Sequence, residues 1–244
     1  MRFITANQGR LEELGLGGLK TQPDRSLATG LEALDGLLPG GALARGAIHE
    51  ALFAPEHGMP ITFALLLARS KIQNPKSQTQ SSPIFWLDSQ HLLYPPALVA
   101  AGIDLDRLYL LHPHKAEDRI WAIAECLRCP GMGAVIADVG RLSLIEARRL
   151  QLSAEKGGGI GVLLRPAGSV SSIYAAATRW LVAPSRGDRT VQRWRIQLIH
   201  GQGGCVGQGV ILEVYREEHH VRAVAPVADR PAAEAETARW RKSA

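Results

Sequence analysis

Short apolar runs alternate with segments of helical periodicity along most of this chain. The runs predicted to be buried strands are 47–53, 83–87, 108–111, 133–138 and 160–164. The helices predicted between them are about 61–70, 117–127, and a third that runs from a Ser143–Glu146 capping box to the glycines at 157–159. Strands that alternate with helices favour a mostly parallel sheet covered on both faces. The pattern therefore predicts an α/β fold.

The last third of the chain changes to alternating apolar and polar residues around a glycine-rich turn. The alternating segments are 179–182, 193–199 and 210–215. They predict antiparallel strands at the end of the sheet. Residues 1–25 are polar and interrupted by glycine, and residues 223–244 are rich in Ala, Pro and Glu. We therefore expect an N-terminal arm (1–25), one domain (26–222) and a disordered tail (223–244).

The amino-acid composition is typical of a globular protein without a membrane-spanning segment. A chain of 244 residues with 46% hydrophobic and 21% charged residues is typical of one globular domain with short appendages. No apolar run approaches the length of a membrane span, and the first residues do not resemble a signal peptide. The three cysteines have no disulfide spacing, which is typical of a reducing compartment. We expect a cytoplasmic protein.

The charge and the cysteines also suggest two kinds of binding. A net charge of +5 permits contact with nucleic acid, but the positive charge is spread along the chain, so we expect DNA contact to be weak. Cys126 and Cys129, with His112 and His114, are residue types of a zinc site, yet the sequence contains no second Cys-x-x-Cys. We interpret both cysteines as small apolar residues on or beside a helix and expect no metal.

The segment between the strand 47–53 and the following helix has the position of a phosphate-binding loop. Such a loop presents backbone N–H groups to the anion and adds a lysine at the terminal phosphates. Here Pro60 stands at the lysine position, and no lysine occurs between Lys20 and Lys71. Proline has neither an N–H nor a charge, and it suits the first position of an ordinary helix. The segment therefore predicts the frame of a phosphate site without its chemistry.

Several segments of the chain resemble RecA. The matching segments are 28–35 and 40–46 in the lead-in, Pro55-Glu56 at the start of the phosphate loop, 88–95 and 102–108 around the catalytic glutamate, and 135–138 at the Walker B strand. The resemblance extends over about 27–215. It implies a RecA-like P-loop NTPase core with a mostly parallel central sheet, antiparallel C-terminal strands and a degenerate nucleotide site.

Within that superfamily the chain resembles the ImuA family. Its signatures are similar to residues 94–98, 101–104 and 148–158. ImuA proteins belong to bacterial mutagenesis cassettes that also encode ImuB, a Y-family polymerase-like protein, and an error-prone polymerase. The resemblance implies an accessory protein of the SOS response and translesion synthesis, with ImuB as partner and RecA as a further partner.

The resemblance also places a degenerate nucleotide site. Its residues are Pro55, Glu56, Gly58, Pro60, Thr62, Gln90 and Asp138. Gln90 takes the position of the catalytic glutamate, and an amide cannot accept a proton at neutral pH. The Asn-Gln pair that RecA places after a later strand falls at Arg165-Pro166. Asp138 alone, without a phosphate cradle, binds Mg²⁺ poorly. We expect a pseudo-ATPase with no catalytic residue and no cofactor.

Three short segments are candidates for partner binding. They are a Phe-x-x-Ala pattern in the arm, paired arginines on a helix, and an aromatic flanked by cations in the tail. Their residues are Phe3, Ala6, Arg148, Arg149, Arg239, Trp240 and Arg241. A chance match, a solvated helix face and a solvated terminus are the competing interpretations. The sequence does not indicate an oligomeric state.

Two other functions stay open at this point. One is an inhibitor of cell division that resembles SulA. SulA has a related RecA-like fold and binds the tubulin-like division GTPase. The other is a basic DNA-binding protein, whose affinity would fall steeply with salt.

Overall fold

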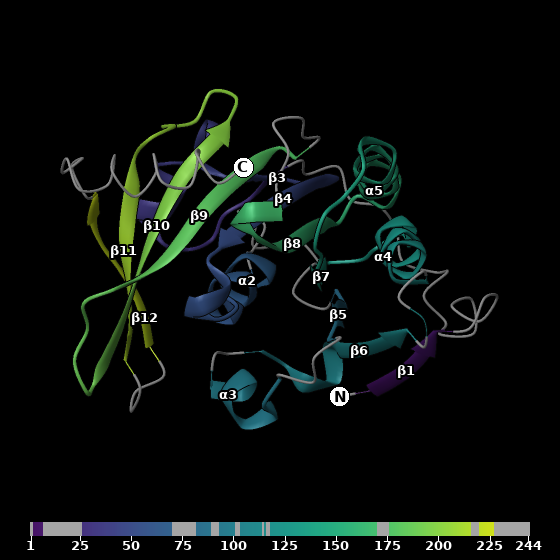
Figure 1. The fold of residues 1–244 in the computed structure, drawn as a ribbon, viewed down its shortest axis with the longest axis horizontal. Helices are drawn as coiled ribbons and strands as arrows, with labels where there is room; N and C mark the ends of the chain where they lie inside the picture. Colours follow the sequence, from purple (N-terminus) through teal and green to yellow (C-terminus); the bar gives the residue numbers. More distant parts are fainter. Residues whose placement is uncertain are drawn as a thin grey trace.

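The computed structural model describes residues 2–6, 26–69, 82–88, 93–100, 103–113, 115, 118–169, 176–215 and 220–226. The parallel strands of its main sheet are β1 (Arg2–Ala6), β4 (Ala47–Phe53), β5 (Ile84–Leu87), β6 (Leu108–Pro113), β7 (Ala134–Asp138), β8 (Ile160–Pro166) and β9 (Thr178–Ser185). The antiparallel strands are β10 (Val191–Gly201), β11 (Gly209–Tyr215) and β12 (His220–Pro226). In the described ranges these strands form one sheet in the order β1-β6-β5-β7-β8-β4-β9-β10-β11-β12 (Figure 1).

The parallel half of the sheet confirms the predicted α/β pattern. Strand β4 has the predicted bounds, and the other four expected strands are each present with ends shifted by a few residues. Neighbouring strands pair in parallel from β1 to β9, so their carboxyl ends lie along one edge of the sheet. That edge is where the loop after β4 leads into the next helix.

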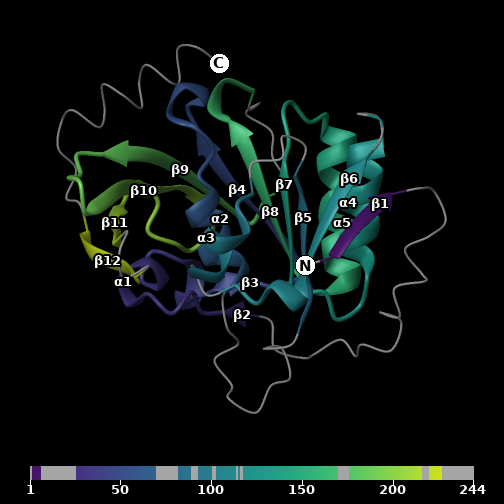
Figure 2. The same ribbon diagram turned by 90° about the horizontal axis from the view of Figure 1, so that it is seen from below.

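Helices cover the parallel strands on both faces. The helices are α1 (Glu32–Asp35), α2 (Ile61–Ala68), α3 (Pro95–Ala100), α4 (Asp118–Arg128) and α5 (Leu144–Gly157), and the two-stranded sheet consists of β2 (Ser26–Leu27) and β3 (Leu43–Ala44). Helix α2 packs on one face, whereas α4 and α5 lie side by side on the other (Figure 2). Among the described residues, no helix is long and apolar enough to cross a membrane.

The antiparallel end of the sheet is also confirmed, and it is longer than expected. Strand β9 pairs in parallel with β4 and antiparallel with β10, so it joins the two halves of the sheet. Strand β12 pairs with β11 and runs to Pro226, past the boundary expected at residue 222. Residues 2–6 of the expected arm form β1, which pairs with β6 at the opposite edge. Residues 7–25 and 227–244 lie outside the described residues.

The sequence at both ends of α5 explains its position beside α4. Ser143 accepts a hydrogen bond from the Glu146 N–H, and the Glu146 carboxylate accepts one from the Ser143 N–H, which confirms the capping box. Gly158 ends the helix in the left-handed conformation, with φ of 76°. A Cβ on Gly157 would lie 1.9 Å from the Leu127 carbonyl oxygen, so only glycine permits this close approach to α4.

A buried carboxylate joins the two halves of the sheet. Glu50 on β4 accepts hydrogen bonds from Arg165 Nη1 on β8, at 2.7 Å, and from Arg179 Nε on β9, at 2.6 Å. All three side chains are nearly inaccessible to solvent. Removing one partner from such a buried group leaves an uncompensated charge, which typically costs about 3–5 kcal/mol. The cluster therefore holds β8, β4 and β9 in one register.

A chain of neutral hydrogen bonds connects the same strands. Trp180 Nε1 donates to Thr178 Oγ1 at 2.9 Å, and the Thr178 hydroxyl lies 2.7 Å from His49 Nδ1. His49 Nε2 lies 2.9 Å from the Ala44 carbonyl oxygen, which only accepts, so Nε2 carries the proton and Nδ1 accepts from Thr178. Burial lowers the pKa of His49 to about 4. The folded protein therefore holds His49 neutral.

His49 makes stability depend on pH in a defined window. Between its ordinary pKa of 6.5 and its folded pKa of about 4, the unfolded chain binds a proton that the folded chain does not. The contribution of His49 to the free energy of unfolding is therefore fully present above about pH 6.5. It is lost as the pH is lowered, and the loss is on the order of 3 kcal/mol near pH 4. Urea unfolding of the wild type and of His49→Gln, at several pH values, measures the contribution. Equal pH slopes for the two proteins would contradict this assignment.

Candidate functional site

The loop between β4 and α2 satisfies its own backbone. Residues Pro55–His57 form a 3-10 turn in which the His57 N–H donates to the Ala54 carbonyl and the Gly58 N–H donates to the Pro55 carbonyl. A phosphate-binding loop needs these N–H groups free and directed toward the anion. Here they are used inside the loop, so Pro55, Glu56 and Gly58 build a closed turn.

Pro60 adds a second tight turn to this loop, which the sequence did not indicate. It lies at the N-cap of α2 with φ of −79° and ψ of 61°, and the Ile61 N–H donates back to the Met59 carbonyl at 2.9 Å. These angles and this bond define an inverse γ-turn. The predicted helix begins at Ile61 as expected, and Pro60 stands just before it, where its missing N–H costs no hydrogen bond. The γ-turn bends the chain before the helix begins. The turn also uses a donor that an anion at this helix end would need.

The antiparallel strands cover the start of α2. Pro60, Thr62 and Phe63 face Trp194 of β10 and Leu212 and Val214 of β11, and the cavity left between them is about 10 Å³. A volume of that size holds at most one water molecule. Phe63 also meets Trp180 edge-on, with ring centroids 5.8 Å apart. The side of this helix start that faces β10 and β11 is therefore packed with the protein's own side chains (Figure 2 shows β10 and β11 curving around α2).

Asp138 at the end of β7 is held by an arginine. Arg119 on α4 donates from Nη2 to the Asp138 carbonyl at 2.6 Å, and the same nitrogen lies 3.2 Å from Asp138 Oδ1. A carboxylate that coordinates Mg²⁺ through water needs its charge directed at the ion. In this structure the arginine already neutralises that charge. Arg119 belongs to no recognisable sequence motif. Its pairing with Asp138 could not be predicted because only the fold brings α4 to the end of β7.

Three further positions bear on the expected nucleotide site. Asp88 is buried and accepts a hydrogen bond from the Leu93 N–H. Gln90 lies outside the described residues. Arg165, at the position of the RecA Asn-Gln pair, belongs to the Glu50 cluster and also donates to the Gly140 carbonyl at 3.2 Å. Both Glu50 and Arg165 thus serve the sheet, and sequence reasoning missed Glu50 because a single acid in an apolar strand gives no spacing signal.

The described residues contain no group of three or more potential metal ligands. Cys126 is fully buried, and burial raises the pKa of its thiol well above the ordinary value. Cys129 is half-buried, and burial raises the pKa of its thiol as well. Both cysteines belong to the core beneath α4, as small apolar residues do.

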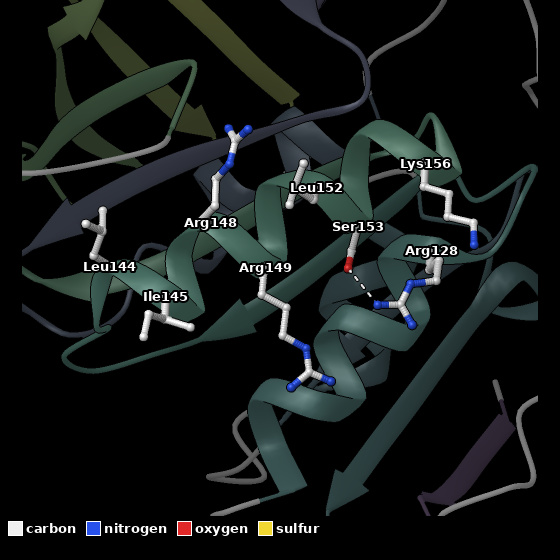
Figure 3. A pocket seen from close by; sticks show the side chains of 8 residues that line it. All are labelled: Arg128, Leu144, Ile145, Arg148, Arg149, Leu152, Ser153 and Lys156. Carbon is white, nitrogen blue, oxygen red and sulfur yellow. Dashed lines mark hydrogen bonds between the residues drawn. The ribbon is translucent and has the colours of Figure 1, made fainter.

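The partner-binding candidates fall on three separate parts of the chain. Phe3 and Ala6 belong to β1, where their backbone pairs with Leu110 and Pro113 of β6. Arg148 and Arg149 are exposed on α5 (Figure 3). The tail candidates Arg239, Trp240 and Arg241 lie outside the described residues.

Comparison with known proteins agrees with this fold. No protein-family model matches the chain. It is 29% identical to Protein ImuA of Caulobacter vibrioides over 239 residues, which cover 89% of this chain and 96% of the relative. It is also 29% identical to Protein RecA of Rubrobacter xylanophilus over 130 residues, which cover 53% of this chain and 36% of that protein. The mitochondrial DNA repair protein recA homolog of Dictyostelium discoideum is 27% identical over 131 residues, 54% of this chain and 27% of the relative.

The similarity to RecA covers about half of this chain, whereas the similarity to ImuA extends over nearly all of both proteins. The mostly parallel sheet with antiparallel C-terminal strands is the core that RecA relatives predict. The chain has an α/β RecA-like core, and it is similar to ImuA proteins over nearly its whole length and to RecA proteins over about half of it.

Proposed function

We propose that this protein is a non-catalytic RecA-like accessory protein of DNA damage-induced mutagenesis. The observation that carries the proposal is the closed loop before α2, in which His57, Gly58 and Ile61 donate their N–H groups to the loop's own carbonyls. The similarity to ImuA over nearly the whole chain supports the biological setting. In this account the protein is a pseudo-ATPase of the SOS response and translesion synthesis.

The loss of hydrolysis follows from three independent features of the site. Pro60 supplies no charge, the described loop offers a closed turn in place of a phosphate cradle, and Arg119 neutralises Asp138. Phosphoryl transfer depends almost entirely on positioning and electrostatic stabilisation. Each missing element typically costs orders of magnitude in rate, so their combined loss leaves no useful activity.

Association with other proteins is the function that such a core retains. RecA-like filament proteins bind one another through surfaces of the same fold, and those surfaces do not depend on an intact phosphate loop. We propose the polymerase-like ImuB as the main partner and RecA as a second one. Because nothing is hydrolysed, release of the partner depends on affinity alone and not on a nucleotide cycle.

One prediction of this proposal concerns nucleotide binding. The wild type is expected neither to hydrolyse Mg-ATP nor to gain stability from it. A ligand that binds the folded protein, present at about 100 times its dissociation constant, would raise the free energy of unfolding by about 2.7 kcal/mol. Pro60→Lys, which restores the missing charge, is expected to behave like the matched Pro60→Ala control, because the N–H groups of the loop are already bonded to its own carbonyls. Thermal unfolding with and without Mg-ATP makes the comparison. An upward shift for Pro60→Lys alone would show that only the charge was missing.

Another prediction of this proposal concerns the partner. Tagged protein isolated from DNA-damaged cells is expected to retain ImuB, detected by mass spectrometry, and to retain it after nuclease treatment. Recovery of the tubulin-like division GTPase without ImuB or RecA would instead assign a SulA-like role. Loss of all association on nuclease treatment, together with DNA binding that falls steeply between about 50 and 200 mM salt, would assign a DNA-binding function.

A further inference from the structure

Helix α5 exposes large aliphatic side chains on the face that points away from the core. Leu144 is 59% exposed, Ile145 is 81% exposed and Leu152 is 47% exposed. The opposite face of the helix is already buried, through Leu150 and Ala154 in the core beneath α4 and α5. A helix that packs on a sheet needs one apolar stripe, and α5 carries a second one. Exposed aliphatic residues gathered in this way mark an interaction surface.

Cations lie between these aliphatic residues at regular helical spacing. Leu144, Arg148, Leu152 and Lys156 follow one another at intervals of four, and Ile145 and Arg149 form the neighbouring row. We call these six residues the α5 face. Within the part of the chain that the structure describes, its three cations form no ion pair.

The acids close to these cations are engaged elsewhere. The Glu146 carboxylate accepts hydrogen bonds from Ser143, and the resulting stabilisation of its charged form lowers the pKa of Glu146. Glu155 accepts a hydrogen bond from Gln151, and Glu125 on α4 pairs with Arg128. Among the described residues these acids form no ion pair with the three cations, so the α5 face itself carries a net positive charge.

A shallow groove runs along this face beside α4. It measures about 610 Å³ and is lined by the α5 face together with Arg128 and Ser153. Figure 3 shows Arg128 reaching across from α4, where its Nη2 lies 3.5 Å from Ser153 Oγ. The close approach at Gly157 and the capping box at Ser143 fix the two helices against each other, so the groove exists before any partner binds.

We propose that the α5 face binds an acidic amphipathic helix of a partner protein. A helix laid in a groove contacts it with apolar residues at positions i, i+3 or i+4, and i+7, which matches the rows on α5. Glu and Asp beside those positions would meet Arg148, Arg149 and Lys156. The inference rests on the proposed function and deepens it, because it assigns both the surface and the chemistry of the partner segment.

Charge and apolar contact favour an acidic helix over three other molecules or segments that could lie in the groove: a second copy of α5, the protein's own tail, and nucleic acid. A second copy of α5 packed on the first by two-fold symmetry would bring Arg148 and Arg149 against the same cations. Residues 227–244 contain four cations and three acids, so the protein's own tail offers no net negative charge. Nucleic acid would complement the cations but would leave Ile145 and Leu152 without an apolar contact.

The test uses full-length protein and a labelled helical peptide of about 15 residues, ~22 Å long, with Leu at i, i+3 and i+7 and Glu on both sides. Fluorescence anisotropy is expected to show saturable binding. Ile145→Ser with Leu152→Ser weakens it by about tenfold or more, and Arg148→Glu with Arg149→Glu abolishes it. A peptide with Lys in place of Glu is expected to bind the charge-reversed protein and not the wild type. This exchange of preference shows that the variant is folded.

Matched controls lie elsewhere on the surface. Arg186→Glu with Arg189→Glu, and Val206→Ser, change exposed residues outside the α5 face and are expected to leave peptide binding unchanged. Failure of the wild type to bind the acidic peptide, or equal binding by the wild type and the α5 variants, would overturn the inference. Binding of a single-stranded oligonucleotide that depends on Arg148 and Arg149 but not on Ile145 and Leu152 would overturn it as well.

The result separates this inference from the function it rests on. If the charge-reversed protein still captures the partner found with the wild type, the docking surface lies elsewhere and the proposed function stands. If the wild type captures no partner at all, the proposed function itself fails.

Discussion

The Glu50 carboxylate, buried between two arginines, joins the parallel half of the sheet to its antiparallel half. Arg165 reaches it from β8 and Arg179 from β9, and both bonds are shorter than 3 Å. The hydrogen-bond chain through Thr178 and His49 connects β4 and β9 on the same stretch of sheet. With β9 fixed in this way, β10 and β11 are placed where Trp194, Leu212 and Val214 cover the start of α2. The packing at the start of α2 is therefore a consequence of how the sheet is held.

This arrangement changes what the core can do. A RecA-like ATPase depends on free N–H groups, a lysine and an acid that are all directed at the nucleotide. In this chain the N–H groups and the acid are bonded within the protein, so the site contributes to the rigidity of the fold. The α5 face combines exposed aliphatic residues with cations that form no ion pair among the described residues, and it is the surface we propose for a partner.

Much of the fold could be predicted from the sequence because its signals are local. The apolar run at 47–53 became β4 with unchanged bounds, and the Ser143–Glu146 spacing became a capping box. Strand β12 was not predicted because its last residues run directly into the Ala-, Pro- and Glu-rich segment that was interpreted as a tail. It becomes a strand by pairing with β11. The site was harder to predict. The γ-turn at Pro60 depends on the angles of three residues, and the Arg119–Asp138 pair depends on α4 lying beside β7, which no spacing in the sequence indicates.

The backbone amides of the loop before α2 give the most direct test of the central claim. Two-dimensional NMR would follow the N–H signals of His57, Gly58 and Ile61 while Mg-ADP is added. The account predicts that these signals stay in place at millimolar nucleotide, because each amide donates to a carbonyl of its own loop. Saturable shifts confined to these three amides would show that the loop opens to receive phosphate, and would contradict the assignment of a pseudo-ATPase.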